Sequence, residues 1–306
     1  MSTALDPVVV GVDGSEPAAV AARWAAREAA LWGTSLTVLT VSAVDEGPSA
    51  GGGTEWQAAK EALAQDVART TRDELTALEP GVPITTETSP AGVETALRQA
   101  SRHALLLVVG PPTGTLSGLL AGSPDADLIA RADCPVVIVR GTGATRTDGA
   151  VVVGVDGSPM SDAAIAWAFE EASRREARLV ALHAWHDSYS GRPFGENPAT
   201  PLIDVGEAEQ RVLAQRLAAW HDRFPHVEAG VVVERDQPRD RLIDRSAEAA
   251  VVVLGSRGRG GFTGMVLGST THALLHHADC PVLVVGSARS PRGIRAFVPP
   301  GRDFGP

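Results

Sequence analysis

The chain has 306 residues, 44% of them hydrophobic, which is enough apolar material for a core in each of about two domains. Its net charge of −10 and pI near 5.3 argue against a broad nucleic-acid or anionic-membrane surface, because such surfaces need clustered Lys and Arg. The chain does not start with a basic segment followed by an apolar one, and no apolar run approaches the ~20 residues of a membrane span. We therefore expect a cytoplasmic protein that binds neither nucleic acid nor membrane.

Short apolar runs alternate with Ala-rich or amphipathic stretches along the whole chain. In the first part we expect strands at 8–12, 36–41, 83–88, 105–109 and 136–139, with helices at 17–31, 56–78, 92–102 and 124–131. In the second part we expect strands at 151–155, 179–184, 230–234, 251–254 and 282–285, with helices at 161–175, 207–223, 239–248 and 270–277. Continuous Val, Leu and Ile runs joined through helices are typical of buried parallel strands, so the pattern predicts an α/β layer fold.

The two parts are copies of one another. The first strand of each part ends in Asp-Gly-Ser, at Asp13 and at Asp156, which are 143 residues apart. Trp24 and Trp167 have the same separation, and we expect both to be packing residues. The chain is therefore a tandem duplication. We predict a first domain at 1–141, a second domain at 150–286 and a mobile Arg-, Pro- and Gly-rich tail at 287–306, with a short polar bridge between the domains.

Three further features concern loops and thiols. The segments 45–54 and 187–202 lack periodicity and follow the second strand of each copy, so we expect loops at the rim of each site. Cys134 and Cys280 each lie in the string Ala-Asp-Cys-Pro-Val. Two cysteines at matching places in two domains do not make a disulfide framework, and they are expected to be small buried thiols.

A glycine-rich stretch from Gly255 to Ser269 follows the fourth strand of the second copy. Glycines let the backbone approach a ligand closely, and a helix that begins with Ser-Thr offers free N–H groups to an anion. The stretch is not a P-loop, because the Gly-Lys-Ser/Thr ending is missing, and it lacks the Gly-x-Gly-x-x-Gly spacing of dinucleotide folds. Its composition alone fits either a phosphate cradle or a long surface loop.

Asp13 and Asp156 stand where a ligand would bind in an open parallel sheet, beyond the carboxyl ends of the strands. An Asp there can accept hydrogen bonds from a ribose or a base. The same residue can equally begin a turn or cap the next helix, and the sequence leaves both roles open.

Taken together, these residues resemble the universal stress protein family in its two-domain form common among actinobacteria, over about residues 7–285. The family's ATP-binding signature is Gly, two residues, Gly, nine residues, Gly, then Ser or Thr, and Gly255, Gly258, Gly268 and Ser269 fit it. The resemblance implies two tandem open parallel five-stranded sheets of order 3-2-1-4-5, with helices on both faces. It also implies an adenine nucleotide between the first and fourth strands.

The resemblance assigns the nucleotide's contacts in the second copy. Asp156 would meet the ribose or adenine with Gly154 beside it, and the backbone at Ala184 would meet the adenine edge. The phosphates would lie on the glycine loop and the helix start. We include in that half of the site Gly255, Arg257, Gly258, Arg259, Gly261, Gly268, Ser269 and Thr270.

The first copy departs from the signature in its phosphate half. Gly11, Asp13 and Val41 retain the nucleoside half. The loop keeps its first glycine and its Gly-Ser ending but is one residue shorter and has a displaced middle glycine; its candidate residues are Gly110, Gly114, Gly122 and Ser123. Two prolines there remove two backbone donors, and nothing matches the two arginines of the second loop. We expect the second copy to bind ATP more tightly.

Two further sequence patterns bear on a metal site and on a hydrolase triad. His272 and His276 have the i, i+4 spacing that can bind a metal, yet Ala273 replaces the glutamate of His-Glu-x-x-His, so a helix end carrying His is the ordinary interpretation. No Gly-x-Ser-x-Gly elbow occurs, which leaves a hydrolase triad without its usual local support.

The preferred hypothesis is a regulatory ATP-binding protein of stress or dormancy, acting through nucleotide-dependent conformation or binding of an unidentified protein partner. The alternatives are a weak ATPase or an adenylyl or phosphoryl transferase on the same scaffold, and a flavin-binding electron-transfer module. ATP is the expected cofactor, with or without Mg²⁺. No paired acids lie within either loop, which favours binding over efficient catalysis. The resemblance also makes the last strands dimer-forming edges, so we expect a pseudo-dimer within the chain and a homodimer of chains.

Overall fold

The computed structural model describes residues 5–43, 54–111, 124–185, 202–235, 237–258 and 267–286. The first copy contains β1 (Val8–Gly11), α1 (Glu16–Trp32), β2 (Leu36–Val41), α2 (Thr54–Leu78), β3 (Ile84–Ser89), α3 (Val93–Ala100), β4 (Leu106–Val109), α4 (Pro124–Arg131) and β5 (Val136–Ile138). The second contains β6 (Ala150–Gly154), α5 (Pro159–Arg175), β7 (Leu179–Trp185), α6 (Leu202–His221), β8 (Ala229–Arg235), α7 (Pro238–Ser246), β9 (Ala249–Gly255), α8 (Ser269–His277) and β10 (Val282–Val285). The α/β alternation predicted from the sequence is confirmed.

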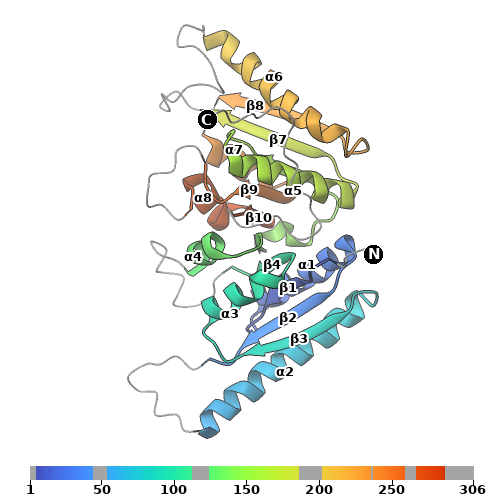
Figure 1. Cartoon of the computed structure of the whole chain (residues 1–306), viewed down its shortest axis with the longest axis vertical. Helices are drawn as coiled ribbons and strands as arrows, with labels where there is room; N and C mark the ends of the chain where they lie inside the picture. The colour runs from blue at the N-terminus through green and yellow to red at the C-terminus, as the bar shows by residue number, and fades with distance from the viewer. Residues whose placement is uncertain are drawn as a thin grey trace, which may run out of the picture.

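The ten strands form one continuous sheet in the order β3-β2-β1-β4-β5-β10-β9-β6-β7-β8 (Figure 1). Within each copy the strands are parallel and follow the predicted order 3-2-1-4-5. The two five-stranded halves are not separate sheets, because β5 pairs antiparallel with β10, with Val137 opposite Leu283. The last strand of each copy thus closes the exposed edge of the other, and the expected pairing of the last strands within one chain is present.

Several local boundaries differ from the prediction. The helix expected at 92–102 ends at Ala100 and continues as a single 3₁₀ turn, η1 (Ser101–His103). The polar bridge between the copies contains a second such turn, η3 (Thr142–Thr145), and the amide and hydroxyl of Thr142 both donate to Oδ1 of Asp279 at 3.0 Å. The helix expected from residue 207 begins at Leu202. The predicted rim loops lie almost entirely outside the described residues, and so does the tail at 287–306.

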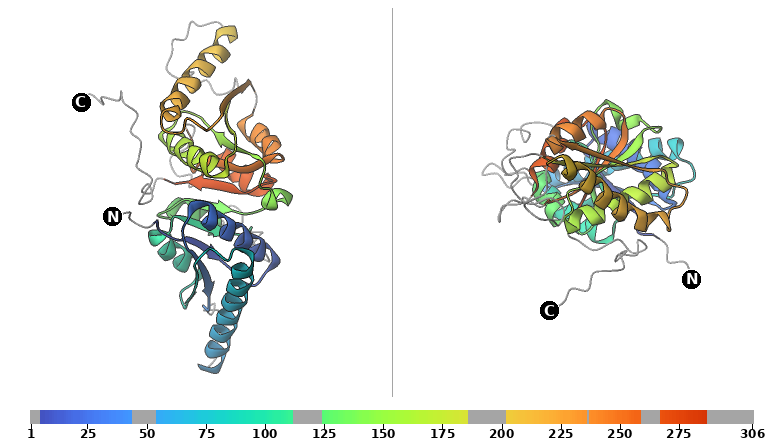
Figure 2. Two further views of the ribbon diagram at one scale, coloured as in Figure 1. Left: turned by 90° about the vertical axis from the view of Figure 1, so that its right-hand side faces the viewer. Right: turned by 90° about the horizontal axis from the view of Figure 1, so that it is seen from above.

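Helices cover both faces of the sheet (Figure 2). The strands alternate their side chains between the two faces. Val8 and Val10 belong to the buried cluster on one face, which also contains residues of α1, α2, α5 and α6, whereas Val9 belongs to the cluster on the other face, with residues of α3, α4, α7 and α8. This two-sided burial is why the strands are continuous apolar runs rather than alternating ones. None of the helices in the described part of the chain combines the length and apolar character of a membrane span.

The tryptophans and cysteines that the sequence assigned to packing are buried. Trp24 and Trp167 expose 4% and 3% of their surface, and both cysteine thiols are free and buried. Burial raises the pKa of the Cys134 and Cys280 thiols to about 12, so neither is a reactive thiolate near neutral pH. Both predictions are confirmed.

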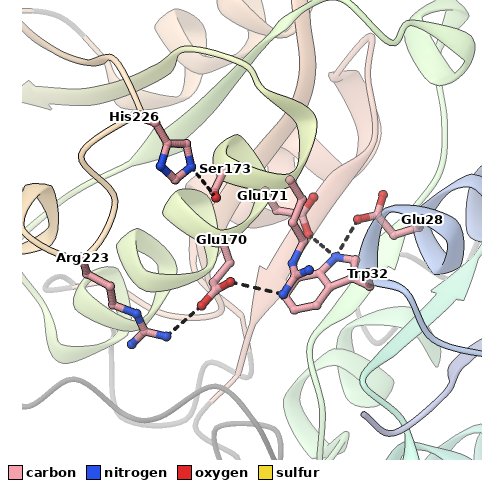
Figure 3. Close-up of polar contacts among 8 residues, drawn as sticks. Glu28, Trp32, Glu170, Glu171, Ser173, Arg223 and His226 are labelled. Atoms are coloured by element: carbon pink, nitrogen blue, oxygen red, sulfur yellow. Dashed lines mark hydrogen bonds and ion pairs between the residues drawn. The ribbon is translucent and has the colours of Figure 1, made fainter. Parts of the chain in front are cut away.

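Helices α1 and α5 meet across the boundary between the copies through a buried polar cluster (Figure 3). Nε1 of Trp32 donates to the carboxylates of Glu28, at 2.9 Å, and Glu171, at 3.1 Å. Arg175 forms ion pairs with both glutamates, its Nε lying 3.0 Å from Oε2 of Glu171. The pKa of Glu28 is raised to about 8, because its burial, together with the nearby Glu171 carboxylate, outweighs the lowering effect of Arg175. At neutral pH the cluster therefore holds a proton.

Truncating Leu283 should weaken the central strands. Leu283 is fully buried and pairs with Val137 on one side and Val253 on the other. We expect Leu283→Ala to lower the free energy of unfolding by about 2–5 kcal/mol through lost transfer energy and a residual cavity. The matched control is Leu63→Ala on α2, where the leucine is 64% exposed and the change should stay within about 0.5 kcal/mol. Urea denaturation measures both, and equal losses would contradict the assignment.

The proton held on Glu28 should make stability depend on pH. A raised pKa in the folded state contributes stability that is fully present below about pH 4.5, the ordinary glutamate value, and is lost as pH rises through about 8. Glu28→Gln mimics the protonated carboxyl. The free energy of unfolding of the native chain should therefore fall relative to this variant by at most about 1.4 kcal/mol per pH unit between pH 5 and 8. Urea unfolding at a series of pH values tests this, with Glu16→Gln at an exposed ion pair as control. Parallel curves for Glu28→Gln and the native chain would rule it out.

Candidate functional site

The site in the second copy begins at the turn that follows β6. Oδ1 of Asp156 accepts a hydrogen bond from the backbone N–H of Ser158 at 2.9 Å, and Gly157 between them has a φ of +78°. Ser158 is the N-cap of α5, and its Oγ accepts from the N–H of Ser161 at 3.2 Å. Asp156 therefore has the turn-forming role, one of the two roles that the sequence left open. This turn holds the carboxylate at a defined place beyond the strand.

The loop that follows β9 comes directly against that carboxylate. A Cβ at Gly258 would overlap Oδ2 of Asp156. β6 and β9 are neighbouring parallel strands, with Val153 opposite Val253, so their carboxyl ends lie side by side. The structure therefore brings together two elements that are about a hundred residues apart in the chain, as the sequence predicted for the first and fourth strands.

The first glycine of the loop is required for a different reason. A Cβ at Gly255 would lie 2.7 Å from Cβ of Met160 and 3.1 Å from its carbonyl carbon, in the first turn of α5. The end of β9 therefore packs directly on the start of the helix that Asp156 introduces. Gly110 occupies the equivalent place in the first copy, where a Cβ would lie 2.9 Å from the carbonyl oxygen of Pro17.

The two ends of the glycine loop are tied together at the start of α8. The N–H of Gly268 donates to the carbonyl of Ser256 at 2.9 Å, and the hydroxyl of Thr271 donates to the carbonyl of Gly255 at 2.9 Å. The N–H of Ser256 in turn donates to the carbonyl of Val285, at the end of β10, at 2.8 Å. The two ends of the loop, at the end of β9 and the start of α8, are therefore held together beside Asp156.

The N-cap residue of helix α8 makes no side-chain hydrogen bond to the helix. Its N-cap is Gly268, which has no side chain to accept a hydrogen bond, whereas Ser15 and Ser158 cap α1 and α5. The first-turn N–H groups at Ser269 and Thr270 have no partner within the helix, and the first turn carries no acidic residue. Exposed Arg257 lies beside this start, because its Cα would be 3.7 Å from a Cβ at Gly268. Such an end of a helix favours an anion.

Ala184 and Gly154, which the resemblance assigns to the nucleoside, have different surroundings. Ala184 lies near the end of β7, opposite Glu234 of β8, and is 8% exposed. Gly154 ends β6, but a Cβ there would meet the side chains of Leu254 and Leu242. Its lack of a side chain accommodates the packing of α7 and β9, and this packing accounts for the glycine without reference to a ligand.

The first copy has the same turn and the same strand ends. Oδ1 of Asp13 accepts from the N–H of Ser15 at 3.0 Å, and Val41 ends β2 opposite Ser89. Gly11 is a packing position like Gly154, since a Cβ there would lie 3.0 Å from Cδ2 of Leu97. The remaining predicted loop residues lie outside the described part of the chain: Gly114, Gly122, Ser123, Arg259 and Gly261.

One residue near the site was missed by the sequence reasoning. Nδ1 of His183 lies 2.7 Å from the carbonyl oxygen of Val155, and because a carbonyl only accepts, Nδ1 is the donor. Its Nε2 lies 3.7 Å from Oε2 of Glu209 on α6, and both side chains are buried. His183 thus holds the residue before Asp156. The available signal was a histidine in an apolar strand where the first copy has Thr40.

The histidines of α8 lie next to each other. The ring centroids of His272 and His276 are 4.7 Å apart, and burial, followed by the positive neighbours His272, Arg140 and His277, lowers the pKa of His276. In the part of the chain that the structure describes, no three His, Cys, Asp or Glu side chains gather as a metal site would require.

Comparison with known proteins agrees with this geometry. The model of the universal stress protein family matches residues 5–140 and 149–286. The chain belongs to the universal stress protein family. A universal stress protein of Mycobacterium tuberculosis is 42% identical over 294 residues, covering 90% of this chain and 95% of the relative. One from Mycolicibacterium smegmatis is 38% identical over 286 residues, covering 91% and 96%.

A solved structure supports the fold of both copies of this universal stress protein. The crystal structure of a universal stress protein from Archaeoglobus fulgidus superposes with a TM-score of 0.72, covering 92% of this chain and 96% of that one. The identity is 18%, so the likeness concerns the α/β fold and not a ligand.

Adding a methyl group at Gly255 should disturb the site's framework. We expect Gly255→Ala to lower the free energy of unfolding by about 1–3 kcal/mol, because Met160 and its backbone must move to accommodate the Cβ. Gly230→Ala is the matched control: it lies in strand β8, where a Cβ would meet only the carbonyl oxygen of Leu179 at 3.9 Å. That variant should change stability by at most about 1 kcal/mol. Chemical denaturation compares them, and an undisturbed Gly255→Ala would contradict the close approach.

Proposed function

We propose that this universal stress protein binds ATP at the second copy and acts through nucleotide-dependent conformation or binding of a protein partner in a stress or dormancy response. The single observation that carries the proposal is the contact of Asp156 with Gly258. It unites a carboxylate suited to a nucleoside with a loop whose spacing, Gly255, Gly258 and Gly268 followed by Ser269, is the family's ATP-binding signature.

The two halves of the site supply complementary chemistry. The carboxylate of Asp156 can accept hydrogen bonds from ribose hydroxyl groups, and the backbone at Ala184 can bond the edge of a base. The N–H groups at the start of α8 and the guanidinium of Arg257 can hold phosphates. Because the chain carries a net charge of −10, the binding of a polyanion depends on such local donors rather than on the overall field.

The first copy is proposed as the weaker site. It has the Asp13 turn, and Gly110 packs against α1 as Gly255 packs against α5. Pro111 follows Gly110 directly, so the N–H that would be offered next in the loop is missing. The nucleoside half is retained, and the phosphate half loses donors and both arginines.

Binding is favoured over turnover. Phosphoryl transfer needs carboxylates for Mg²⁺ and a group that positions water near the phosphates. Asp156 is engaged with the turn and faces the loop, and the second loop from Gly255 to Ser269 contains no acidic residue. We propose a nucleotide sensor located in the cytoplasm, with chains that associate as homodimers, and slow hydrolysis as the outcome to be measured against it.

Asp156→Asn separates the ligand role from the structural one. The amide oxygen keeps the bond to the N–H of Ser158, while the other carboxylate oxygen, an acceptor, becomes an NH₂ donor. We expect an unchanged melting temperature and a loss of ATP affinity of about 10- to 100-fold, as for a hydrogen bond to a charged group. Asp13→Asn, with the same geometry, should reduce total binding less.

Isothermal titration calorimetry with ATP on the full chain measures both variants, together with a timed assay for ADP. Equal losses for the two variants would refute the ranking of the copies, and no binding by the native chain would refute the function. Rapid ADP release would favour an enzyme instead, and a yellow preparation with flavin absorbance would favour the electron-transfer alternative.

A further inference from the structure

The faces of α1 and α5 that meet are the same surface of the two copies, with one difference. The separation of 143 residues relates Trp24 to Trp167 and Glu28 to Glu171. It relates Trp32 to Arg175. We call Trp24, Glu28 and Trp32 the first-copy face, and Trp167, Glu171 and Arg175 the second-copy face. In a two-fold interface, a residue i of one copy that contacts a residue j of the other implies the mate contact of j with i, so a difference at one position alters one contact of each such pair.

Trp32 and Arg175 each pack on the tryptophan, shared by both copies, that lies in the opposite copy. The ring of Trp32 lies 5.3 Å from that of Trp167, at an interplanar angle of 46°. Its equivalent Arg175 lies over the ring of Trp24, 5.7 Å from the centroid. The two contacts are mates under the pseudo-symmetry, one aromatic pair and one cation–π pair.

Trp32 and Arg175 also form hydrogen bonds with the two buried carboxylates of Glu28 and Glu171. Trp32 donates its single N–H to both Glu28 and Glu171 (Figure 3). Arg175 bonds both glutamates as well. Glu28 and Glu171 are 1% and 0% exposed, and the side chain of Arg175 is 6% exposed. Two glutamates therefore share one cation and one indole, both of which the interface needs.

Pairing of two first-copy faces would remove the cation, and pairing of two second-copy faces would remove the indole. Two first-copy faces would bury two glutamates beside two tryptophans and no cation, so that each carboxyl must either take up a proton or remain as an uncompensated buried charge, and both are unfavourable. Two second-copy faces would bury two guanidinium groups with two carboxylates and would lose the indole. Arg174 would then also lose its place over the ring of Trp32, 4.0 Å from its centroid.

We propose that the Trp32 and Arg175 pair selects the partner: the first-copy face binds a second-copy face and rejects its own kind. The partner can be the other half of the same chain or, in an assembly, the second copy of a neighbouring chain. Selectivity arises by making the wrong pairing costly as well as the right one favourable. This inference concerns the interface alone and does not depend on nucleotide binding.

The test exchanges the two residues in the full-length chain. Arg175→Trp leaves two buried carboxylates with no cation and should lower the urea midpoint by about 1 M or more. Trp32→Arg should also lower it, through lost aromatic packing. The exchange W32R/R175W restores one indole and one guanidinium, and we expect it to recover part of the loss of R175W, although Arg174 no longer lies over the ring of Trp32. Coupling of this size indicates direct interaction.

A second exchange serves as control. Leu31 and Arg174 are also equivalent positions, but Arg174 bonds Glu170, whose equivalent in the first copy is Arg27. L31R/R174L should therefore show no recovery beyond the sum of its single variants. The pH profile is a further readout: R175W should gain stability steeply on acidification as its carboxylates take up protons, and W32R/R175W should return to the native profile.

The outcomes separate clearly. Recovery in W32R/R175W, with native mass by light scattering, supports the proposal. Losses that simply add, or a pH profile that the exchange does not restore, overturn it. If R175W yields no folded protein, the exchange decides by itself, since a folded W32R/R175W supports the proposal and an unfolded one refutes it.

Discussion

The antiparallel pairing of β5 with β10 is the contact on which the arrangement of the molecule depends. Each copy by itself would present an edge strand whose backbone groups are unpaired and whose side chains are apolar, Val136 to Ile138 in one and Val282 to Val285 in the other. Such an edge invites association with any other strand. By pairing with each other the two strands satisfy their hydrogen bonds and make a single sheet of ten strands, which also fixes how α1 meets α5.

That pairing connects the candidate nucleotide site of the second copy to the interface between the copies. β10 lies between β5 and β9, and its last residue, Val285, accepts the hydrogen bond of Ser256 at the root of the glycine loop. The strand that joins the copies therefore also anchors the loop proposed to hold phosphates. A ligand that moved this loop would act directly on the strand between the domains, which gives nucleotide-dependent conformation a physical route.

The buried cluster at α1 and α5 shows how a duplicated protein can use its own divergence. Identical surfaces would pair in all combinations, and a pair of first copies would leave both glutamates without a cation. Arg175, at the position where the first copy has Trp32, supplies one cation, and burial leaves Glu28 protonated rather than leaving two charges with one partner. The remaining tryptophan supplies the N–H that both carboxylates accept.

The amino-acid sequence by itself determined the duplication, the α/β class, the Asp-Gly-Ser turns and the signature of the glycine loop. These are local patterns, set by the burial of continuous apolar runs and by the backbone freedom of glycine. Together with the resemblance to a known family they predicted the strand order and the meeting of Asp156 with the loop. Only the tertiary structure decided that Gly154 serves packing, that His183 holds the carbonyl of Val155, and that Trp32 and Arg175 share two glutamates. Those contacts join residues from different helices and strands, and no spacing along one chain records which side chains the fold will bring within hydrogen-bonding distance.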